Sequence, residues 1–213
     1  INDGYKEITI LPMFPQYSTT TTLSIFELIR SIIKKDKSFF KNITIKAVKD
    51  FHDNSLYIKS CASKIKEARE RLGNPDKLLF SFHGIPESYI CDDEPYQMQC
   101  LSTASLIAKE LNLDHMQYEV AFQSRFGKAE WIKPYLSSRL EELPKEGIKN
   151  IHVFCPGFSS DCLETIDEIG RESKEEFLEN GGESFEFIPC LNSDDSFINA
   201  LMDIQKQADI RIL

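Results

Sequence analysis

His83 is the histidine whose surroundings in the sequence point most clearly to chemistry. It follows the apolar run 78–82 and is followed by the residues Gly-Ile-Pro. Glycine and proline force the backbone to turn, so we expect the imidazole at the exit of a strand. Such a side chain can exchange a proton near neutral pH or bind a metal ion. A histidine that only hydrogen-bonds to the turn explains the pattern equally well.

A row of carboxylates is the second candidate feature. Glu164, Glu168 and Glu172 are spaced four residues apart and follow the segment Cys-Pro-Gly-Phe-Ser-Ser at 155–160. On a helix over 161–179 they would stack on one face, where their like charges repel with no cation placed among them. A divalent cation would relieve this repulsion, whereas a solvated helix face is the alternative explanation. The opposite face is expected in the core, with Leu163, Ile166, Ile169 and Phe177.

Aromatic residues accompany two further strand exits. Gln123 and Ser124 lead into a loop with Trp131, the single tryptophan of the chain. The segment 11–18, Leu-Pro-Met-Phe-Pro-Gln-Tyr-Ser, ends another predicted strand with two prolines and two aromatic residues. Aromatic rings at such positions can stack on a flat ligand, although a lone tryptophan is more often part of a core.

An alternation of strands and helices is predicted to position these residues. Strands are expected at 7–14, 43–48, 78–82, 118–122, 151–155 and 185–190. Helices are expected at 20–35, 53–72, 97–111, 130–145, 161–179 and 195–208. This order predicts an α/β fold with parallel strands, in which ligands bind beyond the carboxyl ends of the strands.

Gly73 and Pro75 suggest a domain boundary between a helix and the next strand. Residues 75–192 are then a second α/β domain with His83 and Glu164, and residues 1–74 the remaining part of a first domain. Residues 193–213 form a C-terminal helix, for which packing on the first domain is one option. The first domain has few strands and the chain begins with Ile1, so we interpret the sequence as a fragment or a processed chain.

Composition narrows the class of protein. With 34 acidic and 25 basic residues the formal charge is -9, and no basic block occurs, which argues against nucleic acid as a partner. No apolar run reaches the roughly 20 residues of a membrane span. The six cysteines form no CxxC pair, so free thiols in a reducing cytoplasm are expected.

Several segments together resemble the ferrochelatase family, in the family's order. They are Leu-Pro-Met-Phe-Pro-Gln-Tyr-Ser at 11–18, Ser-Phe-His-Gly-Ile-Pro at 81–86, Phe-Gln-Ser-Arg-Phe-Gly at 122–127 with Trp131, Cys-Pro-Gly-Phe-Ser-Ser-Asp-Cys-Leu-Glu-Thr at 155–165, and Ile-Pro-Cys-Leu-Asn at 188–192. The sequences of these segments are most similar to those of the bacterial ferrochelatases of the protoporphyrin type. The resemblance implies two doubly wound, Rossmann-like chelatase domains, the first of them incomplete at its N-terminus.

The resemblance also implies roles for individual residues. His83 would be the proton acceptor or a metal ligand, Glu164 the carboxylate opposite it, and Glu168 and Glu172 a continuing acidic row for metal or protons. The residues along the porphyrin would be Phe14, Tyr17, Ser18, Gln123, Ser124 and Trp131.

By the same resemblance the reaction is insertion of Fe(II), a substrate, into protoporphyrin IX to form haem. No resident cofactor and no [2Fe-2S] cluster are expected, and the location is cytoplasmic, with loose membrane contact left open. The 213-residue chain by itself is expected to bind porphyrin weakly and turn over slowly. A chelatase for another metal or tetrapyrrole, and a haem- or metal-binding module without catalysis, are the alternatives.

Overall fold

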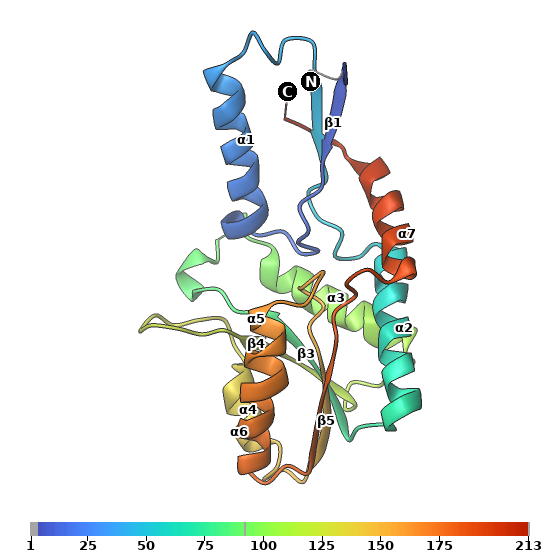
Figure 1. The fold of residues 1–213 in the computed structure, drawn as a ribbon. Coiled ribbons are helices and arrows are strands. Elements are labelled where there is room, and N and C mark those ends of the chain that lie inside the picture. The colour runs from blue at the N-terminus through green and yellow to red at the C-terminus, as the bar shows by residue number, and fades with distance from the viewer. Residues whose placement is uncertain (1–3, 92, 213) are drawn as a thin grey trace.

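The computed structural model describes residues 4–91 and 93–212, and it contains two α/β units that lie one above the other in Figure 1. The lower unit is built on a four-stranded sheet and the upper unit on a three-stranded sheet. Helices surround both sheets, so the predicted α/β fold class is confirmed.

All strands of the larger sheet run parallel, in the order β4-β3-β5-β6. Their bounds are Lys77–His83 for β3, Tyr118–Gln123 for β4, Asn150–Phe154 for β5 and Ser184–Ile188 for β6. From β3 the chain moves outward to β4, and it then returns to the other side of β3 to form β5. The connections that leave β3 and β5 therefore diverge, and the crevice at such a point is where open parallel sheets bind ligands.

Helices cover both faces of this sheet. The first face packs against α2 (Ser55–Leu72), α3 (Tyr96–Glu110) and α7 (Asp195–Ile204). The second face packs against α4 (Leu136–Glu142), the π-helical turn η3 (Glu168–Ser173) and α6 (Lys174–Glu179). Figure 1 shows α4 and α6 on one side of the strands and α2 on the other.

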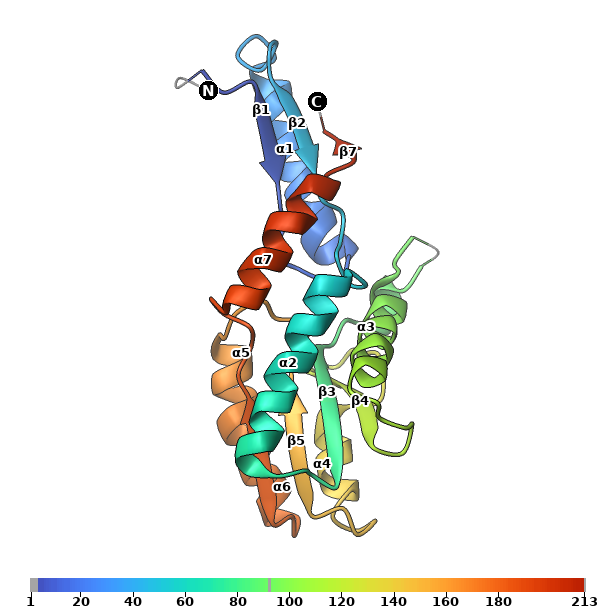
Figure 2. The ribbon, with the colours of Figure 1, turned by 90° about the vertical axis from the view of Figure 1, so that its right-hand side faces the viewer.

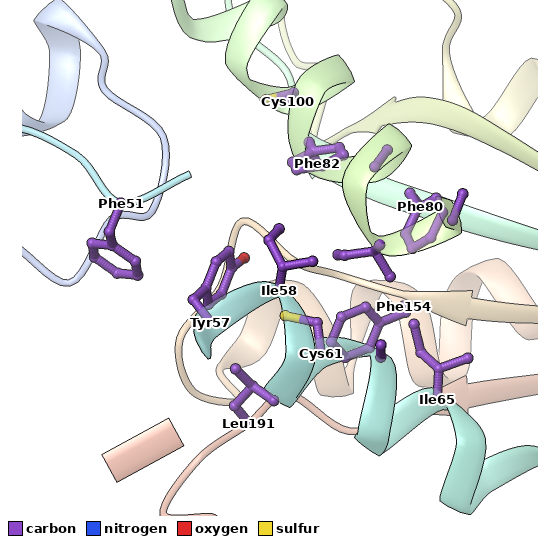
Figure 3. Close-up of a cluster of buried hydrophobic side chains, with 14 of the residues drawn as sticks. Phe51, Tyr57, Ile58, Cys61, Ile65, Phe80, Phe82, Cys100, Phe154 and Leu191 are labelled. Carbon is purple, nitrogen blue, oxygen red and sulfur yellow. The ribbon is translucent and has the colours of Figure 1, made fainter. Parts of the chain in front are cut away.

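The central part of β3 is largely apolar because both faces of this strand are buried. Phe80 and Phe82 of β3 belong to the cluster under α2 and α3, whereas Leu79 belongs to the cluster under α4 and α6. Alternate residues of a strand point to opposite faces, so a sheet covered on both sides needs a continuous apolar run. Figure 3 shows Phe154 of the sheet beside Cys61 of α2, and Phe80 in another part of the same cluster.

The smaller sheet has the order β1-β2-β7. Strands β1 (Glu7–Ile10) and β2 (Thr44–Ala47) are parallel, and β7 (Ile210–Arg211) is antiparallel to β2. Helix α1 (Ser24–Lys35) continues from the π-helical turn η1 (Thr19–Leu23). In Figure 2, α7 leads upward from the larger unit toward β7. The sequence did not predict β7, since a two-residue strand carries no periodic pattern.

Two predicted helices need correction. The helix expected at 130–145 begins only at Leu136, because Trp131 pairs with Pro86 in an isolated β-bridge. The helix expected at 161–179 consists of α5 (Leu163–Ile166), η3 and α6. A π turn holds more residues than an α turn and rotates the residues that follow it.

This rotation also changes the predicted core stripe. Ile169 and Phe177 are fully buried as expected, but Leu163 is 76% and Ile166 59% exposed, so for these two the prediction was wrong. The two residues belong to the short helix α5, ahead of the π turn, and they point to solvent.

Helix α2 contacts elements on the other side of the predicted domain boundary. Although α2 precedes the predicted boundary at residue 74, its apolar face packs on the larger sheet and along α7. The division into residues 1–74, 75–192 and 193–213 stays a prediction. Within the described part of the chain, none of the helices is both long enough and apolar enough for a membrane span.

Candidate active site

A cleft of about 600 Å³ opens at the carboxyl ends of β3 and β5, where the connections diverge. Its lining comes from the loop before η1, from the exit of β3 and from the segment between β5 and α5. Among the residues that line it are Phe14, Ser18, His83, Trp131, Phe158 and Glu164. The cleft therefore brings together residues that are as far apart in the sequence as Phe14 and Glu164.

His83 is the last residue of β3, and a main-chain contact fixes its imidazole. Its Nδ1 lies 2.6 Å from the carbonyl oxygen of Gly84. Because a carbonyl can only accept, Nδ1 must carry the hydrogen. In the neutral ring the lone pair is then on Nε2, which is the atom able to accept a proton or bind a metal ion.

Glu164 lines the same cleft from the first turn of α5. The pKa of its carboxyl lies below the ordinary value, because its own main-chain N–H and the Cys162 thiol donate to it and because His83 lies nearby. Cys162 caps α5 at its N-terminus, so the same residue positions the helix and the carboxylate. At neutral pH the site therefore presents a negative charge opposite an imidazole.

An aromatic wall stands beside His83. The rings of His83 and Trp131 have centroids 6.3 Å apart, and Phe126 meets Trp131 edge-on at 4.9 Å. Trp131 is 4% exposed, whereas Phe126 is 72% exposed. The tryptophan is thus both a packed residue and part of the cleft lining.

Gly84 is required for this wall. A Cβ at residue 84 would lie 3.0 Å from Cε3 of Trp131 and 3.0 Å from the carbonyl oxygen of Gln123. We expect Gly84→Ala to displace the indole and to lower the free energy of unfolding by about 1–3 kcal/mol, the usual cost of overpacking. Trp131 is the single tryptophan, so its emission spectrum reports the displacement directly and urea unfolding gives the stability.

Gly170→Ala is the matched control, because its Cβ would meet no atom closer than 3.6 Å. An unchanged emission spectrum in Gly84→Ala would show that the indole does not depend on this contact.

The opposite wall comes from the loop that follows β1. Phe14 and Ser18 line the cleft, and their role as porphyrin contacts stays a prediction from the family resemblance. Tyr17 is 9% exposed and is not among the lining residues; its ring lies under Nζ of Lys49, at 4.9 Å. The structure thus brings together Phe14 and Ser18 but not Tyr17.

Gln123 and Ser124 lie behind the cleft and hold the acidic helix. Gln123 is 3% exposed, and its Nε2 donates to the main-chain oxygen of Glu164 at 2.7 Å. The amide and the hydroxyl of Ser124 each donate to Glu168 at 2.6 Å. Ser124 adopts a positive φ of 64°, which turns both donors toward the helix. Their contacts in the structure are with the helix rather than with the cleft.

Glu168 and Glu172 face a second, smaller cavity of about 180 Å³. Glu176 shares that cavity, although no sequence pattern pointed to it. Contrary to the sequence analysis, a cation does stand among the acids, since Nη2 of Arg171 lies 3.0 Å from Oε1 of Glu172. The acidic row therefore divides, with Glu164 in the large cleft and the others behind it.

Asp161 fixes the segment between β5 and α5. Its carboxylate accepts the main-chain N–H of Cys190 at 3.0 Å and Nδ2 of Asn192 at 2.7 Å. Burial raises the pKa of Asp161, but the hydrogen bonds from Asn192 and Cys190 lower it by more, so the pKa lies below its ordinary value.

A depressed pKa means that Asp161 contributes stability at neutral pH, and that this stability is lost as the pH falls through the folded-state pKa. We expect Asp161→Asn to lower the free energy of unfolding by about 1 kcal/mol at pH 7. The difference from the unsubstituted protein should shrink as the pH drops below 4, and urea unfolding across pH 3–7 measures it. A difference that is independent of pH would contradict this account.

Sequence reasoning missed several residues around the cleft, among them Tyr96, Phe158, Cys162 and the nearby Glu94. Tyr96 Oη donates to the main-chain oxygen of His83 at 2.8 Å. Cys162 lies within the conspicuous segment 155–165 and could have been found there. Glu94 and Tyr96 had no comparable signal, because they precede and begin an ordinary helix.

Within the described residues, Asp50, His52 and Asp53 are the metal-type side chains that meet as a group of three. They lie in the loop between β2 and α2, and Nδ1 of His52 contacts Asp50 at 2.7 Å. In the cleft, His83 and Glu164 provide one nitrogen and one carboxylate. A metal ion there would take its remaining ligands from whatever else the cleft binds.

The fold is that of the chelatases among solved structures. SirB from Bacillus subtilis with Fe³⁺ superposes with a TM-score of 0.68 at 14% identity, over 98% of this chain and 74% of that one. SirB from Bacillus subtilis subspecies spizizenii, a sirohydrochlorin chelatase in complex with cobalt, superposes with a TM-score of 0.65 at 12% identity. The match covers 100% of this chain and 76% of that one.

The particular family follows from sequence. The family model described as ferrochelatase matches residues 1–209, and the chain belongs to the ferrochelatase family. The ferrochelatase of Janthinobacterium sp. (strain Marseille) is 45% identical over 202 residues, which is 95% of this chain and 54% of that protein. The ferrochelatase of Idiomarina loihiensis is 41% identical over 201 residues, which is 94% of this chain and 54% of that protein. The chain spans about half the length of the curated relatives it matches.

Proposed function

We propose that this chain carries the metal-insertion site of a ferrochelatase, which places Fe(II) in protoporphyrin IX to form haem. The observation that carries the proposal is that His83, with Nε2 free, and the charged Glu164 line one largely apolar cleft. Membership of the family supports the reaction class.

Metal insertion requires that the porphyrin lose its two pyrrole N–H protons as the metal enters. We propose that Nε2 of His83 accepts such a proton, while its Nδ1–H continues to donate to the carbonyl of Gly84. The protonated ring keeps this hydrogen bond, since both nitrogens of an imidazolium are donors. Both protons leave to solvent in turn, and the macrocycle receives the metal in their place.

Glu164 would act on the incoming cation. Fe(II) must exchange bound water for ring nitrogens, and a carboxylate beside the cleft offsets its charge during that exchange. The low pKa of Glu164 keeps the carboxylate ionised for this purpose. Only two side chains, His83 and Glu164, would bind the metal here, which leaves it coordination positions through which to pass to the ring.

The aromatic lining favours a flat, apolar substrate. Trp131 and Phe126 form one side, and Phe14 lies on the loop that forms the other side. Such rings stack on a planar macrocycle, which supports a porphyrin over a highly charged tetrapyrrole.

We further propose that the reaction needs no resident cofactor or cluster and takes place in the cytoplasm. Four of the six cysteines, Cys61, Cys100, Cys155 and Cys190, are buried.

The test is insertion of Zn(II) or, without oxygen, Fe(II) into protoporphyrin IX, followed by porphyrin fluorescence. It compares the 213-residue chain with a form extended by the additional sequence of the Janthinobacterium relative. Insertion by the extended form supports the proposal. A folded extended form that binds porphyrin or haem without metal insertion would instead support a binding module. Preferential metal insertion into another tetrapyrrole would support a different chelatase.

A further inference from the structure

A row of buried polar contacts joins the two walls of the cleft. Nε2 of Gln16 donates to Oγ1 of Thr103 at 3.0 Å, and the main-chain N–H of Tyr17 donates to Oε1 of Gln99 at 2.6 Å. The next two residues, Ser18 and Thr19, both donate to Glu94. The loop at 16–19 is thus fastened to residues 94–103 of the larger unit.

Glu94 is the charged member of this row. Its Oε2 accepts from Ser18 Oγ at 3.1 Å, from Thr19 N at 2.8 Å and from Thr19 Oγ1 at 2.5 Å. The residue is 6% exposed and forms no ion pair with the described residues, so these donors offset its charge. A buried carboxylate is costly unless it is hydrogen-bonded in this way.

The same carboxylate reaches the other wall. Its Oε1 accepts from Tyr96 N at 3.3 Å, and Tyr96 Oη donates to the main-chain oxygen of His83 at 2.8 Å. Ser18 and Tyr96 both line the cleft. A short chain of contacts therefore runs from the Ser18 wall through Glu94 and Tyr96 to the strand end that bears His83.

From this geometry we propose that Glu94 is a positioning residue that sets the spacing between the Ser18 wall and His83, and so the affinity for the flat substrate. The inference rests on the proposed function, because it concerns the same cleft. Glu94 does not line the cleft, so it acts through Ser18 and Tyr96.

A purely structural role for Glu94 is the competing explanation, since its contacts with Ser18 and Thr19 also lie at the beginning of η1. The two explanations predict different kinetics. Loss of a helix-end contact lowers stability and leaves substrate affinity alone. Loss of wall spacing weakens porphyrin binding more than it slows the chemical step, because His83 and Glu164 both belong to the larger unit.

The experiment uses the extended protein and protoporphyrin IX, with quenching of tryptophan fluorescence for affinity and Zn(II) insertion for kcat and KM. We expect Glu94→Ala to raise Kd and KM for porphyrin about tenfold, with kcat changed by less than about threefold. Glu94→Gln keeps the shape and one acceptor oxygen for Thr19, so it should restore most of the affinity and remains informative if the alanine variant does not fold.

Asp76→Ala is the matched control. Its carboxylate also accepts main-chain donors, Lys149 N at 2.9 Å and Asn150 N at 2.8 Å, but it lies at the amino ends of β3 and β5, opposite the cleft. The Asp76→Ala variant should lower the urea midpoint of unfolding without changing the Kd for porphyrin.

If Glu94→Ala lowers the urea midpoint and leaves the Kd for porphyrin unchanged, the positioning role is overturned while the proposed function stands. If the unsubstituted protein neither binds nor metallates porphyrin, both proposals are overturned.

Discussion

Replacing His83 by alanine is expected to lower the rate of metal insertion by about 10²- to 10⁴-fold, the range that a positioned proton acceptor contributes. The reason is that His83 is the cleft residue with a free nitrogen lone pair, held in one tautomer by the carbonyl of Gly84. Porphyrin binding should change little, because the aromatic wall of Trp131 and Phe126 is retained. Zn(II) insertion at saturating porphyrin, with Kd from Trp131 quenching, measures the two effects separately.

Chemical rescue sharpens this test. The alanine variant leaves space at the end of β3, so added imidazole should restore part of the rate if the ring acts as a proton acceptor. His115→Ala is the control, since His115 is exposed and does not line the cleft. An alanine variant at position 83 with a rate near that of the unsubstituted protein would rule out a chemical role for His83.

Replacing Glu164 by glutamine is expected to lower kcat/KM for the metal by about 100-fold, the scale of one well-placed electrostatic contact. Glutamine keeps the size of the side chain but removes the charge that offsets the cation. The low pKa of Glu164, set by its own N–H, by Cys162 and by His83, means that this charge is present in the unsubstituted protein at neutral pH. Dependence of the rate on Zn(II) concentration at fixed porphyrin provides the measurement.

The matched control is Glu175→Gln. Glu175 is exposed on α6 and lies 3.6 Å from Arg171, away from the cleft. The Glu175→Gln substitution removes one carboxylate from the same acid-rich segment, so any effect of net charge alone on the rate would appear in both variants. Equal rates for Glu164→Gln and Glu175→Gln would show that Glu164 has no specific role in metal insertion.

The sequence by itself determined where the main strands lie and which reactive side chains stand at or after their ends. Six strands lie close to where apolar runs predicted them, although the first ends at Ile10 rather than at residue 14. The signal is clearest for β3, which is buried on both faces and is therefore largely apolar. His83 ends β3 and Glu164 follows β5, as the Gly-Ile-Pro and Cys-Pro-Gly-Phe segments indicated. These are local signals, since a turn needs particular residues at particular positions.

Only the tertiary structure decided which of these residues meet. The order β4-β3-β5-β6 makes β3 and β5 neighbours and creates the divergence point where His83 and Glu164 share a cleft. The π turn η3 altered the expected acidic and apolar faces, and the positive φ of Ser124 directed it to Glu168 rather than to the cleft. Glu94 meets the loop at 18–19 through contacts with residues some 75 positions away. Strand order, helix phase and buried polar contacts depend on partners distant in sequence, and no local pattern encodes them.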